Sequence, residues 1–289
     1  MKLLKILSLL ATVLLSSLFA MGEQRVKLGD NAALRYWAAF SEMQDWAVTE
    51  EQAKQLNGIL DGTVPYDDSQ FGQLIEKNKD ALEVMARGTA LPNCDWGLDY
   101  GLAENTPVEY VRNALKLGRL NVLGAFHLGL KGDNDGAAQV LIAGIRFSHD
   151  VANGGTLFAT LAAQDLLVDH FRAIEGLQHL NGFSPAQLAN LRKAVARLGP
   201  EGLDWETAMR MEMAVLNRPD WQKNISLDRV TQAYVNALKD PSTLPQLEQL
   251  LAGLPMPLRE VIPLPKVVVA RKQEFENKLQ HIRAVLQVN

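Results

Sequence analysis

An all-α fold is predicted for this chain, either an antiparallel multi-helix bundle or a short α-α superhelix of about ten helices. Apolar residues recur at helical spacing along almost the whole sequence, β-branched residues are sparse, and no segment alternates convincingly with a period of two. The chain has 289 residues, 47% of them hydrophobic and 21% charged. This is ordinary globular composition, and the length is sufficient to bury a large core.

The first 22 residues have the three-part pattern of a secretory signal peptide. Lys2 and Lys5 form a basic start, residues 6–18 are apolar apart from serines and a threonine, and Ala20 and Gly22 place small residues at the −3 and −1 positions. The apolar run is shorter than the ~20 residues that span a membrane, so we expect cleavage, with an uncleaved membrane anchor as the alternative. The protein is then exported to the periplasm or the extracellular space, without stable membrane insertion, and residues 23–289 form a single helical domain.

The mature chain is mildly acidic. Without Lys2 and Lys5, 27 of the 29 basic residues remain against 33 acidic ones, a formal charge of about −6. No basic patch is present for phosphate contacts, so nucleic acid binding is not expected.

Cys94 is the one cysteine of the sequence, which excludes an internal disulfide and a thiolate metal cluster. We expect no metal and no cofactor, because no motif for either is present.

The elements of the first third follow from helix-start and helix-stop signals. Thr49 and Gln52 form a capping box, and glycines end the second and third segments. The helices expected here cover residues 31–45, 49–62 and 67–86, followed by an irregular stretch over 89–105.

Three antiparallel helices in the middle of the chain are the predicted core, over residues 106–130, 135–152 and from 156 to at least 174. The first carries small residues along one face, including Gly118 and Gly129, which indicates a partner helix packed unusually close. The third is apolar on most sides, and such a helix is usually buried on most sides.

The remaining helices are expected at 184–198, 204–217, 226–239 and 265–287. Half of the twelve prolines fall between Pro241 and Pro265, so this segment cannot form one continuous helix. We expect a proline-rich arm over 240–265, extended apart from a short helix near 246–251. The last helix is amphipathic and is expected to dock on the rest of the domain.

Two segments resemble those of a group of uncharacterised exported bacterial helical proteins. They are the segment from Asn31 to Phe40 (NAALRYWAAF), which follows the signal peptide, and the loop from Cys94 to Gly97 (CDWG). The resemblance covers roughly the first half of the mature chain. It implies export and an all-helical fold, and it carries no assigned activity.

Cys94 is the first candidate for chemistry. A nucleophilic thiol needs a base within hydrogen-bond reach and a lowered pKa, and no histidine is adjacent to Cys94 in the sequence. The interpretation favoured here is a half-buried structural thiol in the loop 93–104, with Trp96 and Tyr100 holding the loop on the helices.

Asp165 and Asp169 are the second candidate. At 100° per residue they share one side of the helix 156–174 with Arg172. Paired carboxylates suit acid–base catalysis or a metal ligand set, whereas the spacing from Asp169 to Arg172 equally suits a structural salt bridge. The structural network is the favoured interpretation.

His149 is the third candidate. It lies toward the apolar face of the helix 135–152, which favours a core histidine hydrogen-bonded across a helix interface over a ligand or a proton carrier. Metal binding is not expected, because no second histidine follows at i+3 or i+4. We expect His127, His170 and His179 to be solvated.

These observations favour a non-enzymatic binding or scaffold protein of the cell envelope, with a protein partner. The first alternative is a small-ligand-binding protein or an enzyme that uses the loop 93–104 and the helix 156–174. The second is an envelope component held by an uncleaved amino-terminal helix.

Overall fold

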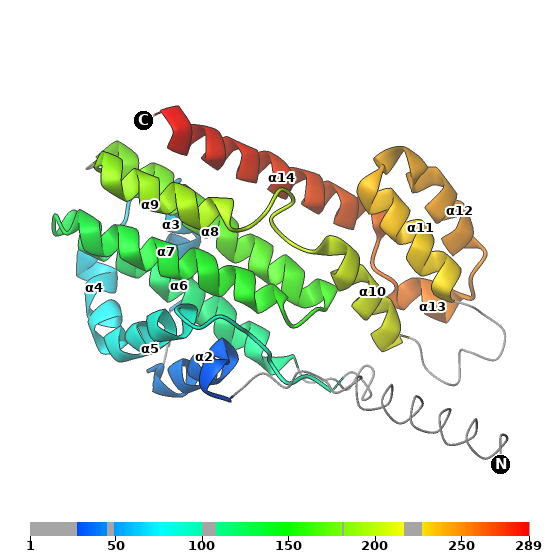
Figure 1. Ribbon diagram of the computed structural model, residues 1–289, viewed down its shortest axis with the longest axis horizontal. Coiled ribbons are helices and arrows are strands. Elements are labelled where there is room, and N and C mark those ends of the chain that lie inside the picture. Colours follow the sequence, from blue (N-terminus) through cyan, green and yellow to red (C-terminus); the bar gives the residue numbers. More distant parts are fainter. Residues whose placement is uncertain (1–27, 45–48, 100–107, 181, 217–226, 289) are drawn as a thin grey trace, which may run out of the picture.

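The computed structural model describes residues 28–44, 49–99, 108–180, 182–216 and 227–288. Within these ranges the regular elements are all helices, which confirms the predicted all-α fold (Figure 1). The predicted signal peptide and the segment 100–107, which includes Tyr100, lie outside the described residues. In the described part of the chain, no helix is both long and apolar enough to cross a membrane.

The first helices are α2 (Ala32–Glu42), α3 (Glu50–Leu60), α4 (Asp68–Lys77) and α5 (Lys79–Thr89), preceded by the 3-10 turn η1 (Leu28–Asp30). The capping box of Thr49 and Gln52 is present at α3. The prediction of a single helix over 67–86 is wrong, because Asn78 separates α4 from α5. The Asn78 amide donates to Leu74 O at 2.9 Å and accepts from the Gln44 backbone at 2.9 Å, so the side chain competes with the helical ladder.

The core consists of α6 (Glu109–Leu130), α7 (Asn134–Ala152) and α8 (Leu157–Leu180), joined by short turns and lying side by side in the centre of the bundle (Figure 1). A Cβ on Gly118 would lie 2.5 Å from Leu166, and one on Gly129 would lie 2.5 Å from Leu177. The small-residue face of α6 is therefore what allows α8 to approach so closely, as the sequence predicts.

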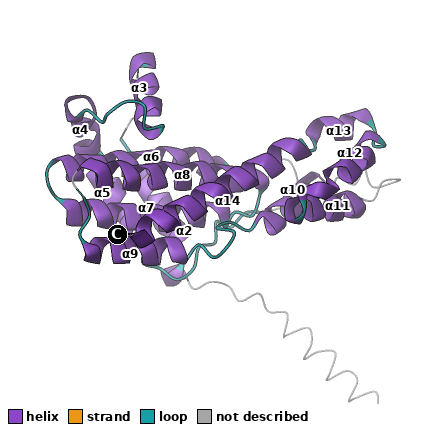
Figure 2. Cartoon of the chain, turned by 90° about the horizontal axis from the view of Figure 1, so that it is seen from above, coloured by secondary structure: helices purple, strands orange, loops and turns teal. Residues whose placement is uncertain are grey.

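The second half contains α9 (Pro185–Ala196), α10 (Trp205–Leu216), α11 (Leu227–Lys239), η3 (Pro241–Thr243), α12 (Leu244–Ala252), α13 (Met256–Val261) and α14 (Pro265–Val288). Helices α10 to α13 gather at one end of the molecule, and α14 runs from there back along the bundle (Figures 1 and 2). The fully buried residues of α14 are Phe275, Leu279, Ile282 and Leu286, and this helix packs on α8 and α9.

The proline-rich segment is more helical than predicted. Pro241, Pro245 and Pro257 all occupy the first or second position of a short helix, where proline has no intrahelical hydrogen bond to lose. The prolines therefore divide the segment into short helices instead of holding it extended.

Candidate functional site

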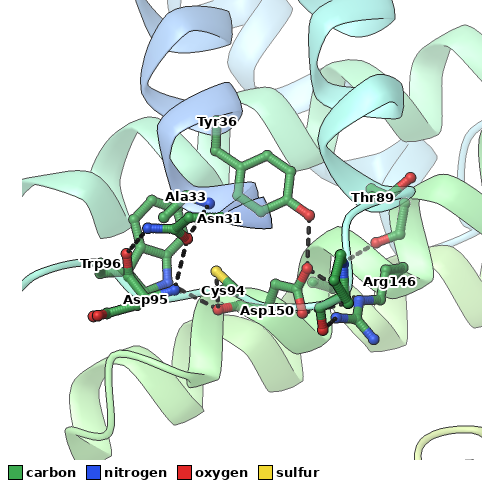
Figure 3. Close-up of polar contacts among 12 residues, drawn as sticks. Asn31, Ala33, Tyr36, Thr89, Cys94, Asp95, Trp96, Arg146 and Asp150 are labelled. Carbon is green, nitrogen blue, oxygen red and sulfur yellow. Dashed lines mark hydrogen bonds and ion pairs between the residues drawn. The ribbon is translucent and has the colours of Figure 1, made fainter. Parts of the chain in front are cut away.

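Cys94 lies in a loop that is fastened to α2 and α7 (Figure 3). Its Sγ is 3.6 Å from the carbonyl oxygen of Asp150, which also accepts from Trp96 Nε1 at 2.8 Å. The Asp150 carboxylate accepts from the Tyr36 hydroxyl at 2.7 Å and from Arg146 Nε at 3.1 Å. These contacts hold the loop and the end of α7 together.

The surroundings of Cys94 oppose a nucleophilic role. Burial, with the negative charge of Asp150 as a second cause, raises the pKa of the Cys94 thiol well above its usual range. The thiol is therefore protonated at neutral pH, and a protonated thiol is a poor nucleophile. This favours the structural interpretation of Cys94.

Asp165 and Asp169 face a polar pocket of about 340 Å³ between α3, α6, α8 and α14. Its charged residues come from four separate parts of the chain: Asp61, Arg119, Asp165, Asp169, Arg172, Arg271 and Glu274. None of the described residues of the loop containing Cys94 lines this pocket. The structure therefore does not bring the first and second candidates into one site.

Two of the three arginines in the polar pocket are already engaged. Arg172 Nη1 donates to Asp61 Oδ1 at 2.9 Å and lies 3.9 Å from Asp169 Oδ1. Arg271 forms an ion pair with Asp165. Asp165 is therefore ion-paired, but its partner lies on α14 and not on α8.

Asp169 and Arg119 are the less satisfied groups of the pocket. Burial raises the pKa of the Asp169 carboxyl to about 7, against the opposing effect of Arg119 and Arg172. The Nε of Arg119 is buried and has no hydrogen-bond partner among the described residues. The Arg119 guanidinium group lines the pocket without an ion pair among the described residues, so its charge is available to an anionic ligand.

A second depression, the apolar groove, adjoins the polar pocket. It has a volume of about 350 Å³ between α6, α8 and α14, and its apolar residues are Leu115, Phe158, Leu161, Ala162, Val267 and Val268. Asp165 and Arg271 line both depressions. The ion pair between them therefore forms the boundary of one amphipathic site, which we call the α8 groove.

His149 is half-buried on α7 and lines a separate cavity, the His149 pocket, whose other larger residues are Gln139, Ile142, Ile145, Arg146, Arg197 and Leu198. Its imidazole has no hydrogen-bond partner in the described part of the chain. The predicted hydrogen bond across a helix interface is therefore not found. Burial lowers the pKa of His149, so its ring is neutral at neutral pH.

The prediction that His127 and His170 are solvated is wrong. His170 is fully buried between α8 and α6, where 2.9 Å separates its Nε2 from the amide of Asn121 and 2.6 Å separates its Nδ1 from Leu166 O. Burial lowers its pKa to about 4. A neutral ring carries one N–H, so it donates either from Nδ1 to Leu166 O or from Nε2 to Asn121 Oδ1. His127 is also buried and contacts Asp68 and Glu76, whereas His179 is exposed as expected.

No protein-family model, curated protein or solved structure matches this chain. The described residues contain no group of three or more histidine, cysteine or acidic side chains that could hold a metal ion.

Proposed function

We propose that the protein is an exported, non-enzymatic binding protein of the cell envelope, and that a segment of a protein partner binds in the α8 groove. The observation that carries the proposal is that the apolar groove and the polar pocket share Asp165 and Arg271, and so form one site along α8. Helix faces and grooves of this kind commonly receive peptide segments.

The apolar half supports binding of hydrophobic side chains. Phe158 is 54% exposed and Val267 is 55% exposed, although both line the apolar groove. Leu264, directly before α14, is 68% exposed. Burying a large apolar side chain contributes roughly 1.5–3 kcal/mol, so filling this groove is a substantial source of affinity.

The polar half supports a carboxylate on the bound segment. Arg172 and Arg271 already pair with Asp61 and Asp165, whereas the buried Nε of Arg119 lacks a partner among the described residues. Arg119 lines the pocket and has no ion pair among the described residues, so a carboxylate would pair with its guanidinium group through a charge-assisted hydrogen bond.

The length of the α8 groove favours a peptide over a small metabolite. Its lining on α8 extends from Phe158 to Arg172, which at 1.5 Å per residue is about 21 Å. We therefore expect a partner segment with apolar residues at one end and an aspartate or glutamate at the other.

A catalytic role for the polar pocket is the second candidate, favoured by Asp169. A carboxyl group with a pKa of about 7 in a cleft is suited to proton transfer at neutral pH. Asp169→Asn distinguishes the two functions. If the protein is a binding protein, the variant still binds its partner, although the titratable carboxyl group is gone. If it is an acid–base enzyme, the variant folds normally but loses turnover.

Site-specific photo-crosslinking in cells tests the binding proposal. A photoreactive residue is introduced in place of Phe158 or Val267 in the groove, and in place of Leu34 or Leu130 as exposed controls that do not line it. We expect one protein to be captured from both groove positions and from neither control. Equal capture from all four positions, or none from the groove, would contradict the proposal.

Export is tested separately at the amino terminus. Mass spectrometry of the protein recovered from the cell envelope should give a mature chain that begins at Glu23. An intact amino terminus in the membrane fraction would instead support the alternative of an uncleaved anchor.

A further inference from the structure

The His149 pocket is a cavity of about 310 Å³ between α5, α7 and α9. It shares no lining residue with the α8 groove. Its volume is at the small end of the range for ligand sites, which is about 300–1,000 Å³. A compact ligand therefore fits this pocket, which is separate from the α8 groove.

The walls of the His149 pocket are mainly apolar. Ile142, Ile145 and Leu198 supply the larger surfaces, and Ala86, Ala143 and Ala194 keep space open between the three helices. A chain of a few methylene groups or one small ring would find hydrocarbon on several sides. The apolar part of a ligand is therefore stabilised by removal from water.

The charges that line the pocket are all basic. Arg146 and Arg197 contribute guanidinium groups, and no aspartate or glutamate lines the cavity. Arg146 is held by Asp150, with 3.0 Å between Nε and Oδ1, so its charge is already compensated. Arg197 is exposed, and its guanidinium group has no hydrogen bond or ion pair in the described part of the chain. Arg197 therefore remains available to an anion.

His149 adds a second free polar group. Its imidazole lines the same cavity and has no hydrogen-bond partner among the described residues. A neutral imidazole always carries one N–H, which a carboxylate oxygen can accept. The pocket therefore combines an apolar interior with an available cation and an available neutral donor.

We propose that the His149 pocket binds a small amphipathic carboxylate, with its apolar chain between α7 and α9 and its carboxylate on Arg197 and His149. An alkyl ammonium ion would be repelled by Arg146 and Arg197, and no carboxylate lines the pocket to pair with it. An uncharged alcohol would gain the apolar contacts and lose the ion pair. The predicted order of affinity is therefore carboxylate first, alcohol second and amine last.

Isothermal titration calorimetry of the mature protein with octanoate tests this proposal, with octan-1-ol and octylamine as matched ligands. We expect saturable octanoate binding that is at least about tenfold tighter than that of either comparison ligand, because one hydrogen bond to a charged group supplies about that difference. Absence of binding across the straight-chain acids from hexanoate to decanoate would overturn the proposal, and so would equal affinity for octan-1-ol.

Two variants, one directly after α9 and one on it, locate the site. Arg197→Gln should weaken octanoate at least about tenfold, whereas Lys193→Gln removes an exposed charge of α9 that does not line the pocket and should leave affinity unchanged. An equal effect of both variants would overturn the assignment. Ile142→Trp fills the cavity and should abolish binding. If that variant does not fold, the comparison of Arg197→Gln with Lys193→Gln still decides the question.

Discussion

Asp169 and Arg172 lie one helical turn apart on α8, with 3.9 Å between Oδ1 and Nη1, but Arg172 directs its closer contact of 2.9 Å to Asp61. Asp169 is consequently buried beside an arginine that is bound elsewhere. Burial raises its pKa to about 7, so the carboxyl group is protonated over much of the acidic range in the folded protein.

Asp169→Asn should therefore gain stability relative to the wild type as the pH rises. Between pH 4 and pH 7 the native state binds more protons at Asp169 than the unfolded state, so this group makes the free energy of unfolding fall with increasing pH. The difference between this pKa of about 7 and the ordinary pKa of an aspartate corresponds to at most about 4 kcal/mol. Urea unfolding at pH 4.5 and pH 8 measures the difference, with Glu83→Gln on the exposed surface of α5 as the control. The same stability difference at both pH values would contradict this account.

His170 should have the opposite effect on stability. Its pKa is lowered to about 4 by burial, so between pH 6.5 and pH 4 the unfolded state binds more protons than the native state. The stability that depends on neutral His170 is thus lost as the pH falls through this range, by at most about 3 kcal/mol. His170→Gln should flatten this dependence in urea unfolding experiments. A variant with an unchanged slope would show that His170 does not titrate as proposed.

Gly144→Ala should disrupt the contact between His170 and Asn121. A Cβ at position 144 would lie 2.0 Å from His170 Nε2 and 2.2 Å from Asn121 Oδ1, which neither buried group can accommodate without moving. We expect a loss of about 3 kcal/mol in the free energy of unfolding. Gly124→Ala on α6 is the matched control, because its nearest neighbour would be 3.5 Å away and alanine favours the helix. Comparable losses from the two substitutions would argue against the crowding at position 144.

Cys94 should resist alkylation in the folded protein. Its raised pKa and its burial against Asp150 leave little exposed thiolate. Iodoacetamide labelling at pH 8, followed by mass spectrometry, should be at least about 100-fold slower in buffer than in urea. Fast labelling of the native protein would instead support a reactive thiol.

Much of the fold could be predicted because local signals and tertiary packing agree. The capping boxes at Thr49 and Ser184 are both present, and the small-residue face of α6 meets α8. The break at Asn78 could not be predicted, because it depends on a hydrogen bond with Gln44 from a segment distant in the sequence. The helices of the proline-rich segment could have been foreseen from the preference of proline for first turns.

The candidate site was only partly accessible from the sequence. Helical periodicity places Asp165 and Asp169 on one face, but Arg119 and Arg271 reach them from α6 and α14, and no local pattern marks such residues. The exposure predicted for His170 is wrong because α8 is covered on most sides, so a polar residue on this helix does not indicate an exposed face. The apolar character of the helix was the signal that should have led to a buried histidine.

Recognition of a carboxylate-bearing segment in the α8 groove is tested by the affinity of the captured partner segment. The segment crosslinked at Phe158 is synthesised with its native carboxylate and with the corresponding amide, and both are titrated into wild-type, Arg119→Gln and Phe158→Ala proteins by calorimetry. We expect the amide to bind the wild type at least about tenfold more weakly than the carboxylate. Arg119→Gln should remove this preference, whereas Phe158→Ala should weaken the binding of both peptides. Equal binding of the two peptides to the wild type, with no effect of either substitution, would contradict this expectation.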